Sequence, residues 1–247
     1  MNTGAVDPLD EIANVAKEFG LWFHIDGAYG ALAALDRRKR ALFKGIARAD
    51  SLSLDAHKWL YTPIDAGCLL FRDQALAQRA FSADEADYIK IHEQGDDESF
   101  AFWDYGVELS RRFRALKIWM TLRYYGIRKI SEAIAEDISL AEYFGQQVTA
   151  AKDFELLAPV ELSICCFRYV PKELQAAPAS ETDLNEVNTR IMHAVQRGGE
   201  AYLSNATVNG KFALRACVTN FRTTRADIDF TLNVIRNAAL AAADQTK

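Results

Sequence analysis

The sequence predicts an α/β protein in which a mostly parallel sheet with helices is followed by a compact α+β unit. Two observations lead to this prediction. Short apolar runs bounded by turn residues alternate with a helical pattern in residues 1–73, and a second series of strands and helices begins near residue 154. The chain has 247 residues, 50% of them hydrophobic, which is enough to bury one large core or two smaller ones.

The first predicted element is a helix within DPLDEIANVAKEFG, residues 7–20. Its apolar residues recur at helical spacing. Asp7 can cap the first turn, Pro8 suits the first helical position, and Gly20 suits the end of the helix.

Three strands are predicted next, over LWFHID (21–26), DSLSLD (50–55) and GCLLFRD (67–73), because each is a short apolar run bounded by turns. Asp26 and Lys58 then fall near the carboxyl ends of strands. Open α/β sheets bind their ligands at these ends.

The chain changes character after the third strand. Residues 82–106 are rich in acids and have no sustained period, which predicts a long polar loop that is mobile or functional. RFRALKIWMTLRYYG (112–126) predicts a helix that stops at Gly126, and ISEAIAEDISLAEYFGQQV (130–148) predicts another. We therefore expect a part of a large domain over 1–125.

The second unit, over 126–247, is expected to be a small α+β domain. After the helix that opens it, its predicted elements alternate between strand and helix, over VELSICCFRYV (160–170), 184–197, KFALRACVTN (211–220) and 225–243. Residues 171–183 are expected to form a surface loop within it.

Composition excludes several classes of function. The formal net charge is −5, the pI is about 5.5 and the basic residues are scattered, so nucleic acid is not an expected partner. No run approaches about 18 uninterrupted apolar residues and the first residues lack a leader pattern, so we expect a cytoplasmic protein without a membrane segment. The four cysteines form no CxxC pair and no zinc spacing, so no metal site is expected.

Lys58 and Asp26 form a pair with a recognisable chemistry. A lone lysine at a strand end is usually solvated. Here HIDGAYG (24–30) stands 32 residues before the lysine, with an aspartate at the end of a strand and small residues that let a flat ligand approach. A lysine that can be neutral and nucleophilic, with an acid that keeps a pyridine nitrogen protonated, is what covalent binding of pyridoxal phosphate needs.

Four stretches carry a resemblance to a known family. NTGAVDPLDEIANVAKEFGLWFHIDGAYG (2–30), followed by ADSLSLDAHKWLYTPIDAGCLLFRD (49–73), resembles the group II pyridoxal-phosphate decarboxylases, which include aromatic-L-amino-acid, histidine and glutamate decarboxylases. The resemblance continues through LSRRFRALKIWMTLRYYG (109–126) and GKFALRACVTNFRTT (210–224). Its central motif, HxDxAY with a later DxHKW, is specific. The resemblance implies the aspartate-aminotransferase-like fold (fold type I), pyridoxal 5'-phosphate as cofactor, an amino-acid substrate and a homodimer.

The resemblance also implies roles for individual residues. Lys58 would hold the cofactor covalently, and Asp26 would pair with its pyridine nitrogen. His57 could touch phosphate or substrate, although a purely structural histidine is the alternative. Ala28 would pack on one face of the ring, or simply within the strand. Arg215 would lie near the substrate carboxylate, with a surface ion pair as its alternative.

Further positions concern the proton donor. Phe102 falls where relatives carry the tyrosine that reprotonates the substrate carbon, and phenylalanine cannot donate a proton. Tyr105 and Tyr88 are close enough to serve if the loop is shifted. Asp55 falls where relatives often carry a polar residue near the phosphate, but its charge would repel phosphate and no such role is expected.

Relatives are longer, and their amino-terminal part supplies the phosphate-binding loop and a side chain that stacks on the ring. We expect this sequence to lack both. The predicted activity is decarboxylation of an L-amino acid, with aromatic amino acids among the candidates, to an amine and carbon dioxide. Two alternatives stay open: an aldehyde-forming or transaminating enzyme of the same fold, and a catalytically silent remnant that only folds and dimerises.

Overall fold

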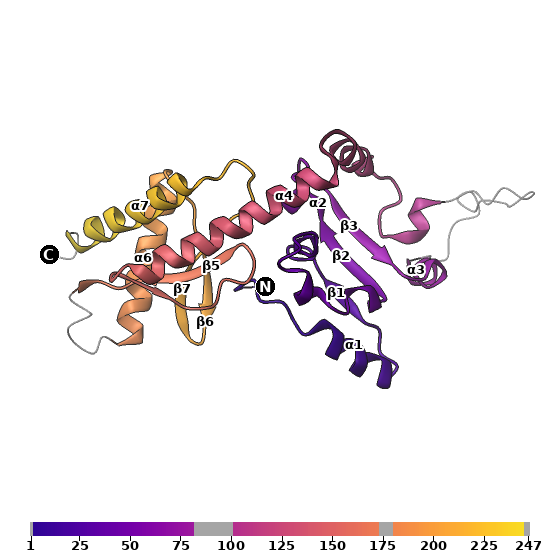
Figure 1. Ribbon diagram of the computed structural model, residues 1–247, viewed down its shortest axis with the longest axis horizontal. Helices are drawn as coiled ribbons and strands as arrows, with labels where there is room; N and C mark the ends of the chain where they lie inside the picture. The colour runs from indigo at the N-terminus through magenta and orange to yellow at the C-terminus, as the bar shows by residue number, and fades with distance from the viewer. Residues whose placement is uncertain (1, 82–100, 173–179, 245–247) are drawn as a thin grey trace, which may run out of the picture.

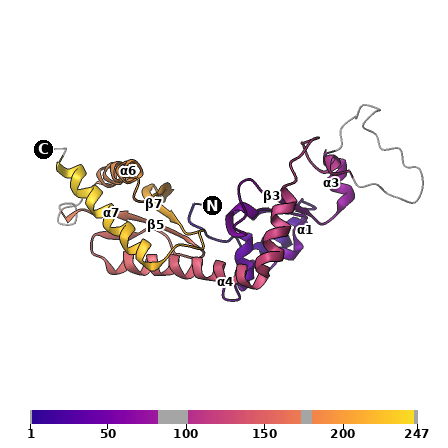
Figure 2. The same cartoon turned by 90° about the horizontal axis from the view of Figure 1, so that it is seen from above.

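The protein consists of two lobes joined by one long helix, as the computed structural model shows for residues 2–81, 101–172 and 180–244. The amino-terminal lobe contains a three-stranded sheet, and the carboxy-terminal lobe contains a four-stranded one. The connecting helix, α4 (Arg114–Ala150), crosses from the first lobe to the second (Figures 1 and 2).

The three-stranded sheet has the order β1-β2-β3. β1 (His24–Asp26) runs parallel to β2 (Ser51–Asp55), so the carboxyl ends of both strands lie at the same edge, as predicted. β3 (Gly67–Phe71) runs antiparallel to β2, which corrects the expected mostly parallel sheet. The link between β2 and β3 is residues 56–66, and a parallel return needs a crossover of a dozen residues or more.

Short helices cover this sheet. α1 (Leu9–Glu18) buries Leu9, Ala13 and Ala16, and Gly20 follows it with a positive φ of 62°, as the predicted stop requires. Asp7 does not cap α1, which has no side-chain cap. The remaining helical segments of this lobe are η1 (Ala31–Leu35), η2 (Arg40–Phe43), η3 (Ile46–Arg48), α2 (Ala56–Trp59), α3 (Gln74–Phe81) and η4 (Phe102–Tyr105).

The helix predicted to stop at Gly126 and the helix predicted over 130–148 are both present, as two helical segments of α4 that meet at a kink at Gly126. α4 runs through Gly126, where the backbone leaves helical geometry at φ 75° and ψ 153°, a conformation that glycine adopts without steric cost. Ile130, Ile134 and Ile138 of α4 belong to the amino-terminal core, whereas Leu140 and Phe144 belong to the carboxy-terminal core. The domain boundary predicted between residues 125 and 126 stays a prediction.

The second lobe is an antiparallel sheet with helices on one face. Its order is β4 (Phe154–Leu156), β5 (Ile164–Tyr169), β7 (Lys211–Cys217) and β6 (Ser204–Val208). Cys165, Phe167 and Leu214 share a core with α4, α6 (Glu181–Gly198) and α7 (Arg225–Asp244). Ile164 and Cys166 point to the opposite face and form a smaller cluster, as the period of two along a strand requires.

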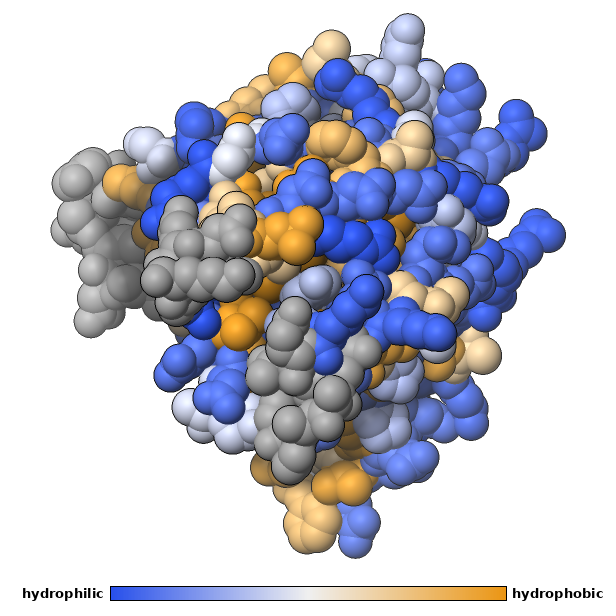
Figure 3. Space-filling view, turned by 90° about the vertical axis from the view of Figure 1, so that its left-hand side faces the viewer, coloured by the Kyte–Doolittle hydropathy of each residue, from blue (hydrophilic) through white to orange (hydrophobic). Residues whose placement is uncertain are grey.

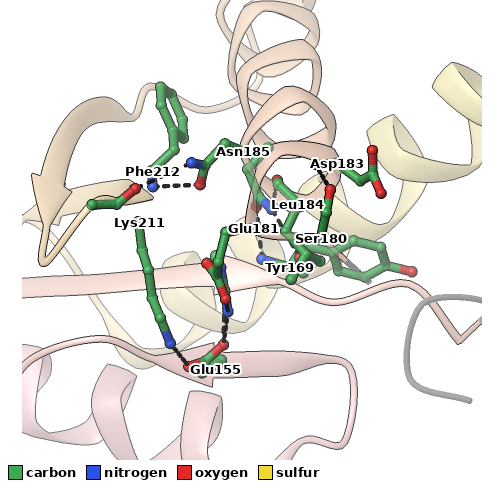
Figure 4. A network of polar contacts seen from close by, with 12 residues as sticks. Glu155, Tyr169, Ser180, Glu181, Asp183, Leu184, Asn185, Lys211 and Phe212 are labelled. Atoms are coloured by element: carbon green, nitrogen blue, oxygen red, sulfur yellow. Dashed lines mark hydrogen bonds and ion pairs between the residues drawn. The ribbon is translucent and has the colours of Figure 1, made fainter. Parts of the chain in front are cut away.

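Polar contacts fasten α6 to the sheet (Figure 4). The Lys211 ammonium lies 2.8 Å from Glu155, and the Asn185 amide oxygen accepts a hydrogen bond of 2.7 Å from the Phe212 N–H. Ser180 caps α6 by accepting from the Asp183 N–H. These contacts join β4, β7 and the first turns of α6.

The surface differs between the two lobes. Figure 3 views the molecule from the end formed by the carboxy-terminal lobe, where hydrophilic residues predominate and hydrophobic ones are scattered. Phe113, just before α4, and the first half of α4, in contrast, expose large apolar side chains: Phe113, Leu116, Trp119, Met120, Tyr124 and Tyr125. Among the helices that the structure describes, none is both long enough and apolar enough to cross a bilayer.

Candidate functional site

The turn that carries Lys58 is formed by local hydrogen bonds at the end of β2. The Ala56 N–H donates to the Ala66 carbonyl at 2.8 Å, the Tyr61 N–H to the Lys58 carbonyl at 3.2 Å, and the Thr62 N–H to the Ala56 carbonyl at 3.2 Å. These bonds close the short helix α2 between β2 and β3. Lys58 therefore lies on a turn that connects β2 to β3 and is closed by hydrogen bonds between its two ends.

The Lys58 ammonium is paired with Asp55. Its Nζ lies 2.7 Å from Oδ2 of Asp55, three residues earlier. The His57 Nδ1 accepts a hydrogen bond of 3.1 Å from the Ala66 N–H, while its Nε2 lies 3.8 Å from the same Asp55 oxygen. Asp55 is thus the immediate partner of the candidate lysine, which sequence reasoning missed. The signal was available in the i, i+3 spacing of opposite charges across a helical turn.

Asp26 lies at the carboxyl end of β1, and its carboxylate is held by two donors. Oδ1 accepts from the Ala28 N–H at 3.1 Å and from the Ser53 hydroxyl at 3.3 Å. The Ala28 carbonyl in turn accepts from the Asp55 N–H at 3.1 Å, which ties the segment after β1 to the end of β2. Asp26, Ala28 and Lys58 line one cavity of about 410 Å³.

Gly27 allows the segment after β1 to lie against β2. A Cβ at this position would come within 2.4 Å of the Ala31 Cβ and 2.9 Å of the Ser53 carbonyl oxygen, and such approaches exclude any side chain. The sequence predicted small residues here so that a flat ligand could approach. The close neighbours of Gly27 are protein atoms, so this glycine serves packing between β1 and β2.

A buried carboxylate stands behind the lysine turn. Asp137 of α4 is 1% exposed, and its Oδ2 accepts from Trp59 Nε1 at 3.0 Å and from the Tyr61 hydroxyl at 2.8 Å. Burial raises the pKa of the Asp137 carboxyl to about 6, against the lowering effect of these two hydrogen bonds. Sequence reasoning missed this residue, although an acid beside Ile134 and Ile138 on the apolar face of a helix was a visible signal.

The other predicted site residues lie outside this cavity. Phe102 and Tyr105 line a second cavity of about 740 Å³ together with Ser53 and Asp55, and the Tyr105 hydroxyl accepts from Gln74 at 2.8 Å. The contacts of Ser53 with Asp26 and of Asp55 with Lys58 connect the two cavities. Tyr88 lies outside the described residues.

Arg215 of β7 does not line either of these cavities. Its Nε donates to the Asn2 carbonyl at 2.9 Å, and its Nη1 donates to Ser204 Oγ at 3.4 Å. Within the described part of the chain, no carboxylate pairs with its guanidinium, so the surface ion pair considered as its alternative role is not formed there.

Similarity to known proteins identifies the family to which this chain belongs. The pyridoxal-dependent decarboxylase conserved domain matches residues 1–170. The chain belongs to the pyridoxal-dependent decarboxylase family. It is 41% identical over 223 residues to an aromatic-L-amino-acid decarboxylase of Bacillus atrophaeus, covering 90% of this chain and 45% of that protein. It is 32% identical over 240 residues to a phenylacetaldehyde synthase of Petunia hybrida, covering 96% and 47%.

Solved structures of the family give the same result for the fold. The crystal structure of Oryza sativa TDC with PLP and tryptamine matches with a TM-score of 0.85 at 32% identity, over 96% of this chain and 48% of that one. The expected fold is thereby confirmed. The chain spans about half the length of the relatives it matches.

The cavity fits part of the cofactor that names the family. It offers an amine from Lys58 and a carboxylate from Asp26, with Ala28 and glycines between them. Lys58 is the only lysine or arginine on the described lining of this cavity, so that lining provides no second cation for a phosphate group. The residues present therefore fit the pyridine ring and its carbonyl carbon, and the phosphate requires further groups.

Proposed function

We propose that this chain contributes the cofactor-binding lysine and its acid partner to a pyridoxal-phosphate-dependent decarboxylase acting on an L-amino acid. The observation that carries the proposal is the common cavity of Lys58 and Asp26, at the carboxyl ends of two adjacent parallel strands. Family membership supports it independently, because the matched domain is pyridoxal-dependent.

Each of the two residues has a defined task. Lys58 holds the cofactor through its amine, which must lose a proton and leave Asp55 before it can act as a nucleophile. Asp26 would hold the pyridine nitrogen protonated, and the hydrogen bonds from the Ala28 N–H and the Ser53 hydroxyl orient its carboxylate. When bound, pyridoxal phosphate supplies an electron sink for the electron pair that remains after carbon dioxide leaves.

The proposed product is an amine, and an aromatic amino acid is the proposed substrate class, since tryptophan, tyrosine and aromatic-L-amino-acid decarboxylases are among the matched relatives. Aldehyde formation is the second candidate. Two observations support it: phenylacetaldehyde synthases are among the relatives, and a phenylalanine stands at position 102. Arg215 remains a proposed carboxylate ligand for the substrate.

The cofactor assignment can be tested by reductive labelling. The chain is incubated with pyridoxal phosphate at millimolar concentration, reduced with borohydride and mapped by peptide mass spectrometry. We expect the label on Lys58 and its loss in Lys58→Arg. Labelling of Lys90 or Lys117 in preference to Lys58 would contradict the proposal. Incubation with L-tryptophan, L-tyrosine or L-DOPA, followed by mass analysis, then distinguishes amine from aldehyde.

We further propose that the chain forms a homodimer in the cytoplasm. The exposed apolar side chains of Phe113 and of the first half of α4 suit an interface core, with Phe113 75% exposed, Trp119 59% and Tyr124 82%. Unpaired cysteines at all four positions suit a reducing compartment. Light scattering across micromolar concentrations tests the dimer. A stable monomer would remove this part of the proposal, and Trp119→Glu should weaken association if α4 lies in the interface.

A further inference from the structure

Trp59 and Tyr61, which closely follow Lys58 in the sequence, both donate a hydrogen bond to one buried acid, Asp137. Trp59 is fully buried, and its indole N–H donates to Asp137 Oδ2; the Tyr61 hydroxyl donates to the same oxygen. Trp59 lies one position after Lys58, and the Tyr61 N–H donates to the Lys58 carbonyl. A single carboxylate oxygen on α4 therefore binds the side chains of two residues, one next to Lys58 in sequence and one hydrogen-bonded to its carbonyl.

This carboxylate lies in surroundings where a charge is costly. Its neighbours on α4, Ile134 and Ile138, are completely buried, and no lysine, arginine or histidine in the described ranges forms an ion pair with Asp137. A buried acid without a cation destabilises a fold unless hydrogen bonds offset the loss of hydration. Two donors on the lysine turn provide that compensation, so the acid and the turn depend on each other.

Trp59 also connects the lysine turn to the segment after Asp26. Its ring stacks on Tyr29 with centroids 4.9 Å apart, and Tyr29 follows Asp26 by three residues. The Tyr29 hydroxyl is fixed by Ser163, at 2.7 Å from its Oγ and 2.9 Å from its backbone N–H. A shift of Trp59 would therefore change the position of Lys58 relative to Asp26.

The backbone at Tyr61 needs this support as well. Tyr61 has a positive φ of 54°, in the left-handed region that residues other than glycine enter at a cost. Its ring packs edge-on against Phe221, with centroids 5.6 Å apart, and its hydroxyl reaches Asp137. These two contacts hold the side chain while the backbone turns toward β3.

We propose that Asp137 is a positioning residue that sets the geometry of the Lys58 turn through Trp59 and Tyr61. The proposal deepens the proposed function, because it rests on Lys58 being the cofactor lysine. Asp137 itself does not line the cavity of Lys58 and Asp26. It acts on the reacting amine only through its two hydrogen-bonded neighbours.

Competitive acetylation measures this effect without the cofactor. Folded protein is treated with a trace of acetic anhydride at several pH values, and the modification of each lysine is read by mass spectrometry. Lys211 is a matched internal reference, since its ammonium lies 2.8 Å from Glu155 in the other lobe and it is 32% exposed, against 38% for Lys58. The measured quantity is the ratio of Lys58 to Lys211 acetylation.

Asp137→Ala should raise this ratio about threefold or more, which corresponds to the loss of a hydrogen bond of typical net strength, because a loosened turn releases Lys58 from Asp55. Asp137→Asn, which keeps an acceptor oxygen, should stay closer to the unmodified protein than Asp137→Ala. An unchanged ratio in folded Asp137→Ala, or equal effects of alanine and asparagine, would overturn the proposal.

If Asp137→Ala does not fold, the variant Tyr61→Phe tests the proposal in the same acetylation assay. It removes one donor and keeps the ring on Phe221, so it should shift the ratio in the same direction by a smaller factor; no shift would overturn the proposal. Failure of reductive labelling at Lys58 would refute the proposed function and leave the acetylation result readable, since acetylation needs no cofactor.

Discussion

Replacing Asp137 by asparagine should change how the stability of the fold depends on pH. Burial raises the pKa of this carboxyl from 3.8 to about 6. The folded state therefore binds its proton more tightly than the unfolded state does. The associated stability is fully present below about pH 4 and is lost as the pH rises through 6. Two pKa units correspond to roughly 3 kcal/mol.

Asparagine resembles the protonated acid in carrying no charge, so the variant should not show this loss. The difference in free energy of unfolding between the variant and the unmodified protein should move in favour of the variant by about 2–3 kcal/mol between pH 4 and pH 7. Urea denaturation followed by circular dichroism at intervals of half a pH unit measures this difference. Subtracting the two curves removes the titration of every other group.

The absolute stability of the variant is a weaker test than this pH-dependent difference. The asparagine amide brings two N–H donors into a buried position, and each donor left without an acceptor costs about 1–3 kcal/mol at every pH. That cost shifts the whole curve and leaves its slope unchanged. A difference curve that is flat from pH 4 to pH 7 would refute the assignment of the titration to Asp137, whatever the absolute values.

Three other changes have definite expected outcomes. Asp55→Asn removes the partly exposed ion pair with Lys58. Since a solvent-accessible pair is worth up to about 1 kcal/mol, labelling of Lys58 by pyridoxal phosphate and borohydride at pH 7 should be up to about fivefold faster; slower labelling would show that Asp55 aids the reaction. Phe102→Tyr should shift products from aldehyde toward amine, since a general acid is worth about 10²–10⁴-fold in rate; mass analysis showing identical products in both proteins would contradict this role. Asn188→Leu removes three hydrogen bonds to backbone groups from a fully buried side chain and should lower the free energy of unfolding by about 2–4 kcal/mol; a loss below 1 kcal/mol in urea denaturation would contradict this accounting.

The elements with strong local patterns could be predicted from the sequence. The helix after Pro8 and the strands ending at Asp26 and Asp55 are all present, and burial follows the apolar spacing in α1 and at Ile25 of β1, whereas the buried residue of β2 is Ser51. The prediction of a mostly parallel sheet was wrong for β3, because apolar periodicity does not report the direction of a strand. The short link of residues 56–66 does indicate it, since it is too short for a parallel crossover. β6 was missed although Asn209 and Gly210, both with positive φ, form the Asn-Gly turn typical of a hairpin.

The candidate site could be predicted only as far as its motifs reach. The motifs placed Lys58 and Asp26 together because both follow strands that lie side by side, and the common cavity agrees with that expectation. The burial of Asp137 could be predicted from its place between Ile134 and Ile138, but its partners could not, since they lie 76 and 78 residues away and depend on where α4 crosses the lobe. The position of Arg215 likewise depends on how the second lobe packs against the first.

The contacts that hold Lys58 and Asp26 lie within this chain, whereas the described lining of their cavity offers a phosphate no lysine or arginine besides Lys58. Asp26 is fixed by Ala28 and Ser53, and the Lys58 turn is fixed from β3 and α4. Each charge-assisted hydrogen bond to a phosphate that is not formed costs about 1.5–3 kcal/mol of affinity. Selective labelling and weak equilibrium binding should therefore occur together, with borohydride marking Lys58 while absorbance titration gives a Kd above the micromolar range. Submicromolar binding would show that groups outside the described lining hold the phosphate.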